Sequence, residues 1–112
     1  MPLINLFTSS PFIENPDQLL QNLSSEVAHL TGKPQKFVMA ILQTDLKIFF
    51  DGNQDPACYV EINSIGSLDP NKMSQVITES LSKDLELPQN RIYIRFDDVS
   101  PELWSWNGKT FG

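Results

Sequence analysis

Residues 69–91 read DPNKMSQVITESLSKDLELPQNR, and they repeat the layout of residues 15–37, NPDQLLQNLSSEVAHLTGKPQKF, 54 positions later in the chain. Prolines at positions 2, 16 and 34 recur at positions 56, 70 and 88. Because proline fixes φ and lacks a backbone donor, shared proline positions indicate that turns and element boundaries fall at the same places in both halves. Three matches at one offset favour an internal repeat over coincidence. We interpret the chain as one domain, residues 1–112, whose two similar halves cover roughly 2–55 and 56–112.

Each half contains a helix-start signal. Asn15-Pro16 and Asp69-Pro70 each place an N-cap residue before a proline at the first helical position. Apolar residues then recur at steps of three and four, the spacing of one helix face. The pattern predicts helices over residues 16–31 and 70–86, with Gly32 as a left-handed stop after the first. The predicted apolar stripes are Leu20, Leu23, Val27 and Leu30 in the first helix, and Met73, Val76, Ile77, Leu81 and Leu85 in the second.

Strand signals flank both helices. The runs over residues 3–8, 36–42, 58–64 and 91–97 are β-branched, aromatic or alternating, and shorter pieces lie near 47–50 and 109–111. The order strand, helix, strand therefore occurs twice. It predicts an α+β two-layer fold with a pseudo-two-fold β-α-β repeat, a four-stranded sheet and both helices on one face.

The second face of this sheet is left without helices. Alternation in the last long strand places one set of side chains towards the helices and the other set on the uncovered face. Several members of the uncovered set are large and apolar, and such a patch is uncommon on a monomer. We expect a partner subunit to cover it, the alternative being a monomer with a curled sheet. The covered set is Ile92, Ile94, Phe96, Val38, Ala40 and Leu42, and the uncovered set is Arg91, Tyr93, Arg95, Phe37, Met39 and Ile41.

Composition excludes several classes of protein. The 112 residues are 40% apolar, enough for one core, and 14 acidic against 8 basic side chains give a net charge of −6. Without a basic stripe, such a chain repels nucleic acid. No apolar run approaches the roughly 20 residues of a membrane span, and the first residues lack a secretory signal, so we expect a cytoplasmic protein. A single cysteine, Cys58, excludes an intrachain disulfide.

The second residue is a proline at the head of a predicted strand. Removal of Met1 would expose the secondary amine of Pro2, whereas a retained Met1 leaves its nitrogen in an amide with no basic lone pair. A free α-amine has a reference pKa of about 7.7–8.0, and burial and nearby cations lower it. Lys33, at a helix–strand junction, is one such candidate cation. The N-terminus is thus a candidate general base near neutral pH.

Five motifs in order, joined to this N-terminal proline, resemble the macrophage migration inhibitory factor family of the tautomerase superfamily. The resemblance runs the length of the chain with no large insertion. The motifs are Met1-Pro2, Thr31-Gly32-Lys33-Pro34, Asn63-Ser64-Ile65-Gly66, Arg91-Ile92-Tyr93-Ile94, and Trp106-Asn107-Gly108 with Thr110-Phe111.

The resemblance implies a homotrimer whose sheets surround a central channel, with active sites at the subunit boundaries. It implies keto–enol tautomerisation of aromatic α-keto acids such as phenylpyruvate and 4-hydroxyphenylpyruvate, with no cofactor and no metal. The family also contains extracellular cytokine-like signals exported without a leader. A ligand for an unknown receptor, with weak or vestigial tautomerase activity, is therefore the alternative function.

The resemblance also assigns roles to residues. Pro2 matches the catalytic base, and Lys33 matches the cation that holds the substrate carboxylate. Ile65 matches the residue whose backbone N–H binds the same end of the substrate, and Tyr93 matches a tyrosine from the neighbouring subunit. Three aromatic residues match the lining of the apolar part of the pocket, namely Phe37, Trp106 and Phe111.

Two positions depart from the family pattern. Arg95 stands where mammalian members carry an asparagine that meets the far end of the substrate, and arginine prefers carboxylates. We therefore expect a preference shifted towards a second acidic group and a lower Pro2 pKa. A surface arginine paired with Asp97 or Asp98 is the alternative. The Cys-x-x-Cys of animal members is absent, because Ala57 and Val60 occupy those positions. A dithiol cycle is therefore excluded, and Cys58 is expected in the core.

Overall fold

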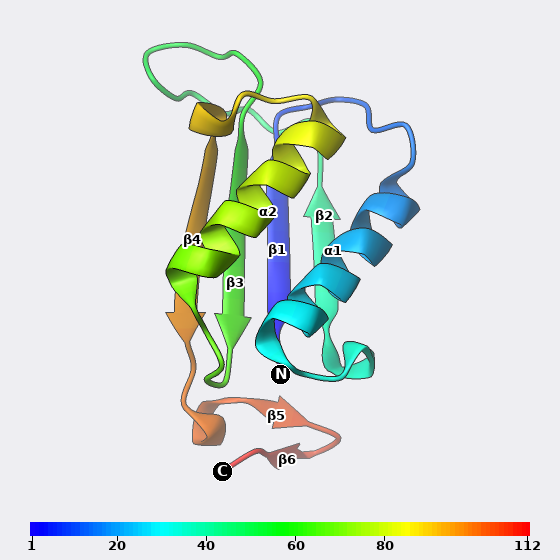
Figure 1. Ribbon diagram of the computed structural model, residues 1–112, viewed down its shortest axis with the longest axis vertical. Helices are drawn as coiled ribbons and strands as arrows, with labels where there is room; N and C mark the ends of the chain where they lie inside the picture. The colour runs from blue at the N-terminus through cyan, green and yellow to red at the C-terminus, as the bar shows by residue number, and fades with distance from the viewer.

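Two strand–helix–strand units build the main body of the protein (Figure 1). The computed structural model describes all of residues 1–112. The first unit contains β1 (Leu3–Thr8), α1 (Pro16–Thr31) and β2 (Met39–Gln43). The second contains β3 (Cys58–Ser64), α2 (Pro70–Leu85) and β4 (Ile92–Asp98). A small hairpin of β5 (Ser105–Trp106) and β6 (Lys109–Thr110) follows.

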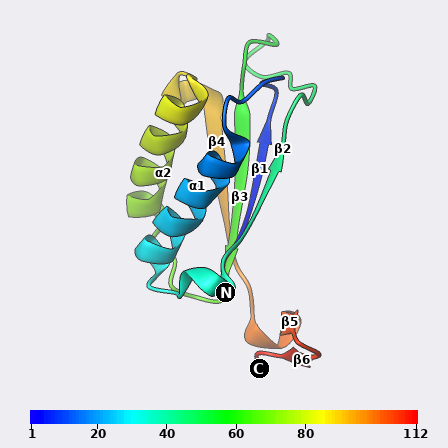
Figure 2. The same cartoon turned by 90° about the vertical axis from the view of Figure 1, so that its right-hand side faces the viewer.

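The main sheet has the strand order β2-β1-β3-β4. Within each unit the two strands run parallel, and the central pair β1 and β3 joins the units in antiparallel register, with Leu3 opposite Asn63. Both helices cover the same face, and the other face is open (Figure 2). The predicted fold class, a four-stranded sheet with two helices on one face, is confirmed.

Both helices begin where their caps predict. The Asn15 side chain accepts a hydrogen bond from Gln18 N at 3.1 Å, and the Asp69 side chain accepts one from Lys72 N at 3.5 Å. Gly32 ends α1 with φ 70°, a conformation that glycine adopts without steric cost. The second helix ends one residue earlier than predicted, because Glu86 itself takes the left-handed conformation.

The core lies between the helices and the covered face of the sheet. The buried residues of α1 are Leu19, Leu23, Val27 and Thr31. The prediction was therefore right for Leu23 and Val27, whereas Leu20 and Leu30 are only half-buried. The α2 stripe was predicted better, since only Val76 falls outside the buried line. The predicted covered set of strand residues packs against this core as expected.

Three strand predictions need correction. The strands predicted from residues 36 and 91 begin instead at Met39 and Ile92, and β4 extends to Asp98. Pro34 and Pro88 each precede a 3-10 turn, Gln35–Phe37 and Gln89–Arg91, which delays the extended chain. No strand forms near residues 47–50, where a single bridge joins Phe50 and Asn53.

The chain termini lie at one end of the sheet. The β5–β6 hairpin stands beyond the lower end of the sheet near the N-terminus, whereas the long loop between β2 and β3 lies at the opposite end (Figures 1 and 2). Neither helix combines the length and apolar character needed to cross a membrane. The predicted N-terminal site is therefore expected at this end of the sheet, where both termini lie.

Candidate active site

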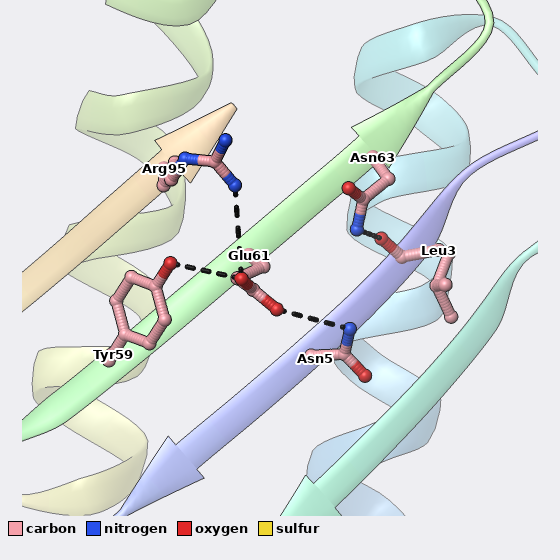
Figure 3. Close-up of polar contacts among 6 residues, drawn as sticks. All are labelled: Leu3, Asn5, Tyr59, Glu61, Asn63 and Arg95. Carbon is pink, nitrogen blue, oxygen red and sulfur yellow. Dashed lines mark hydrogen bonds and ion pairs between the residues drawn. The ribbon is translucent and has the colours of Figure 1, made fainter. Parts of the chain in front are cut away.

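Pro2 directly precedes the first residue of β1 and is held in place by hydrogen bonds. Its side chain is less than 2% exposed, and its carbonyl accepts a hydrogen bond from Met39 N at 3.1 Å. The next carbonyl, that of Leu3, accepts a hydrogen bond from the Asn63 side chain at 3.3 Å (Figure 3). Strands on both sides of β1 therefore hold the first residues of the chain in place.

Two adjoining hollows share the N-terminus as part of their walls. The first, of about 270 Å³, contains Lys33 and Ile65. Its wall is mostly apolar, and we call it the polar hollow only because of the Lys33 charge. Lys33 lies at this hollow because Gly32 ends α1 and turns the chain. Ile65 lies there because it directly follows Ser64, the last residue of β3. Met1, Phe37 and Phe111 belong to the walls of both hollows.

The second hollow, of about 240 Å³, is mainly aromatic, and we call it the aromatic hollow. Phe37 meets Trp106 edge-on with ring centroids 5.7 Å apart. Trp104, just before β5, and Trp106, within β5, both line this hollow. The Phe111 N–H donates to the Trp104 carbonyl at 3.1 Å. A planar apolar group fits such a lining, whereas the polar hollow offers a cation for an acid.

The electrostatics at the N-terminus favour a neutral amine. In the chain with Met1 attached, partial burial and, to a smaller extent, the positive charge of Lys33 lower the pKa of the terminal amine from its ordinary value of 8.0. Both causes disfavour the protonated form. An amine at this place is therefore available as a proton acceptor nearer to neutral pH than an exposed one.

Two of the predicted site residues lie elsewhere within a single chain. Tyr93 is 63% exposed on the open face of β4 and packs edge-on against Phe50. The register pairs Tyr93 with Tyr59, and Tyr59 with Phe7, at the end of β1 away from Pro2. If Tyr93 serves a site of this kind, that site belongs to another copy of the chain.

Arg95 joins a polar network in the middle of the same open face (Figure 3). Its guanidinium lies 3.9 Å from the Glu61 carboxylate, not beside Asp97 or Asp98. Glu61 also accepts hydrogen bonds from the Tyr59 hydroxyl at 3.1 Å and the Asn5 amide at 3.4 Å. Three strands thus hold one carboxylate, which partly offsets the charge of Arg95.

The prediction that Arg91 lies on the open face was wrong. Its guanidinium is buried at the far end of the molecule, where it donates to the carbonyls of Phe50, Asp55 and Pro56 at 2.6–3.2 Å. The side chain also stacks over the Phe50 ring. The alternation of side chains between the two faces of a strand does not apply to Arg91, because this residue belongs to a 3-10 turn and not to β4.

Sequence reasoning missed Lys36, which lies in the wall of the aromatic hollow. Its Nζ atom lies 5.1 Å from the centroid of the Phe37 ring. The available signal was the spacing Lys-x-x-Lys after Gly32, which places two cations within one turn of each other. The 3-10 turn Gln35–Phe37 contains Lys36, so Lys33 and Lys36 reach two adjoining hollows that both include Met1.

Cys58 packs in the core on the helix side, as expected. Burial raises the pKa of its thiol to about 12, so it is not a reactive thiolate. No group of three or more His, Cys, Asp or Glu side chains is arranged to hold a metal ion.

The fold and the hollows define a class: small two-layer proteins with a β-α-β repeat and a partly buried N-terminus beside an apolar pocket. Comparison with known proteins identifies the family. The macrophage migration inhibitory factor (MIF) family profile matches residues 1–112. The factor of Xenopus tropicalis is 33% identical over 99% of both chains, and a Trichinella spiralis homolog is 32% identical over 99% of this chain and 100% of its own.

Solved structures agree. A crystal structure of a homologue from Prochlorococcus marinus is 46% identical, covers 98% of this chain and 99% of its own, and superposes with a TM-score of 0.94. The Trichinella spiralis structure is 29% identical, covers 97% of this chain and 99% of its own, and gives a TM-score of 0.88. The chain belongs to the macrophage migration inhibitory factor family, within the tautomerase superfamily.

Proposed function

We propose that the protein is a keto–enol tautomerase of aromatic α-keto acids such as phenylpyruvate and 4-hydroxyphenylpyruvate, with Pro2 as the general base. The observation that carries this proposal is the lowered pKa of the terminal amine between the polar and aromatic hollows. After removal of Met1 the amine would be that of Pro2. The same causes, burial and Lys33, would then act on the Pro2 nitrogen.

The two hollows suit the two ends of such a substrate. The carboxylate would pair with Lys33 beside Ile65, and the ring would enter the aromatic hollow between Phe37, Trp106 and Phe111. Neutral Pro2 nitrogen takes a proton from the carbon next to the carbonyl, and the electron pair moves to the oxygen as an enolate. The same nitrogen returns the proton to that oxygen and gives the enol. Lys33 stabilises the intermediate charge more than the ground state.

We further propose that the active form is a homotrimer in which Tyr93 and Arg95 complete the site of a neighbouring subunit. The open sheet face supports this, because Met39, Ile41 and Tyr93 are 62%, 39% and 63% exposed there. An apolar face of this kind is stable in water when another subunit covers it. Sedimentation equilibrium should give three times the chain mass, and a monomer at micromolar concentration would contradict the assembly.

The test of the catalytic proposal is the loss of the enol absorbance of phenylpyruvate. Mass spectrometry first verifies that Met1 is absent. We expect Pro2→Gly to lower kcat/KM roughly 10²–10³-fold, as loss of a positioned base does. A matched control inserts one alanine between Met1 and Pro2, which leaves the ring intact but converts its nitrogen to an amide. Full activity in that control would overturn the role of Pro2.

The relatives' shared name describes inhibition of macrophage migration, and it supports a second candidate, an extracellular ligand with weak or vestigial catalysis. The same assay separates the two functions. Processed wild-type protein that fails to convert phenylpyruvate or 4-hydroxyphenylpyruvate would favour the ligand.

A further inference from the structure

Lys36 is the only charged side chain in the wall of the aromatic hollow. The other lining residues are the first three residues of the chain, four aromatic rings, Val38, Met39 and Ser105. The ammonium group lies over the Phe37 ring, which also meets the Trp106 ring at a nearly perpendicular angle. A ring placed against Phe37 and Trp106 would therefore have a cation within its own compartment.

The charge of Lys36 has no acidic partner within the chain. The single ion pair in the structure joins Arg95 to Glu61, and Tyr59 and Asn5 hold Glu61 in place. The positive charge of Arg95 therefore faces a carboxylate before any ligand arrives, whereas that of Lys36 faces only the Phe37 ring. Of these two cations, Lys36 is the one left to attract a second negative group.

The two hollows have separate cations three residues apart. Lys33 lies in the polar hollow and Lys36 in the aromatic hollow, and both hollows share Phe37 and Phe111. A ligand that spans them with its α-keto acid at Lys33 places its ring in the compartment of Lys36. An anionic substituent on that ring then meets the positive charge of Lys36, an exposed side chain in the wall of the hollow, and can accept a charge-assisted hydrogen bond from it.

We propose that Lys36 is a specificity-determining residue that selects aromatic α-keto acids with a second acidic group at the far end of the ring. The proposal rests on the proposed function and names its substrate class. It assigns the preference to a residue of the same chain as Pro2, and not chiefly to Arg95.

The test compares kcat/KM for 3-(4-carboxyphenyl)pyruvate and for phenylpyruvate as a ratio. We expect Lys36→Gln to lower this ratio about fivefold or more, and Lys36→Arg to retain most of it. Lys83→Gln, an exposed change near the end of α2 away from the hollows, is the matched control and should leave the ratio unchanged. Arg95→Asn should change the ratio less than Lys36→Gln does. An unchanged ratio in Lys36→Gln, or an equal fall in Lys83→Gln, would overturn the proposal.

A binding measurement keeps this test separate from catalysis. Trp104 and Trp106 are the chain's two tryptophans, and both line the aromatic hollow, so their fluorescence reports its occupancy. We expect 4-carboxyphenylacetate to bind more tightly than phenylacetate. We expect Lys36→Gln to lower the ratio of the two dissociation constants, phenylacetate over 4-carboxyphenylacetate, at least fivefold. If wild-type protein shows this difference but converts no keto acid, the proposed function fails while the assignment of Lys36 stands. If conversion depends on Pro2 but Lys36→Gln leaves the difference intact, only the assignment fails.

Discussion

The two ends of the sheet carry the same repeat but differ in what fills them. At the lower end Pro2, Lys33 and Phe37 surround open hollows. At the other end the residues 54 positions later are Pro56, Leu87 and Arg91. There Leu87 is buried in the core, and Arg91 fills the space by donating to three backbone carbonyls. The first copy of the motif thus borders two hollows, whereas in the second copy the Arg91 side chain fills the space as a plug.

The segment between β2 and β3 accounts for the filled end of the sheet. Pro56 lies within the chain, and the carbonyls that hold Arg91 belong to Pro56 itself and to Phe50 and Asp55 before it. At the other end Pro2 lines the aromatic hollow beside Met1.

The largest expected effect comes from breaking the plug. Arg91→Met should lower the free energy of unfolding by about 2–4 kcal/mol, because three carbonyls lose a charged donor. Urea unfolding at fixed protein concentration measures this loss. Arg95→Met, which removes an exposed arginine with one 3.9 Å contact, should cost about 0.5 kcal/mol or less. Equal losses in the two variants would show that the plug does not stabilise this end.

A smaller effect should follow when the site is made to resemble its counterpart. Lys33→Leu reproduces the residue at position 87 and should lower kcat/KM for phenylpyruvate roughly 10–100-fold by removing the carboxylate partner. Because the positive charge of Lys33 lowers the pKa of the nearby amine, its loss should raise that pKa. The amine then stays protonated to a higher pH, and the acidic limb of the pH–rate profile should move to higher pH. A limb that stays in place would show that Lys33 does not act on the base.

The smallest effect lies where the two halves meet. Glu26 of α1 faces Ser80 of α2, its counterpart 54 positions later, and one of its carboxylate oxygens is buried without a partner. Burial raises the pKa of Glu26, Ser80 opposes the shift by hydrogen bonding, and the charge of Asp84 adds to it. A carboxyl whose pKa is raised by folding costs stability when ionised.

Glu26→Gln should therefore stabilise the protein at pH 7 by about 1 kcal/mol or less. The gain should shrink as the pH falls through the raised pKa, because wild-type Glu26 is then protonated too. Urea unfolding at pH 7 and at pH 4 measures both values. Glu79→Gln, an exposed change on α2, is the control, and a Glu26→Gln gain equal at both pH values would contradict the assignment.

Much of the fold was predictable because proline and cap signals are local. Asn15-Pro16 and Asp69-Pro70 determine where the helices start, and β1 and β3 have the bounds expected from their side-chain patterns. The errors came from turns of one kind. The 3-10 turns after Pro34 and Pro88 are too short to leave a periodic signal, so Phe37 and Arg91 were assigned to strands.

The candidate site was predictable only in part. The structure gathers Pro2, Lys33, Ile65 and the three aromatic residues at two adjoining hollows, whereas no local pattern shows that Lys36 shares them. The ion pair between Glu61 and Arg95 could not be predicted either. The two residues are 34 positions apart and become neighbours only through the register of β3 and β4. The roles of all these residues, including those of Tyr93 and Arg95, stay predictions.

The C-terminal hairpin has a practical consequence. Since Trp104, Trp106 and Phe111 form a wall beside Met1, a purification tag at either terminus would lie against the hollows and would bias any affinity measured there. The turn at residues 51–54, at the opposite end of the molecule, is exposed except for a half-buried Asn53. An internal tag or a dye inserted at that turn would leave both termini free.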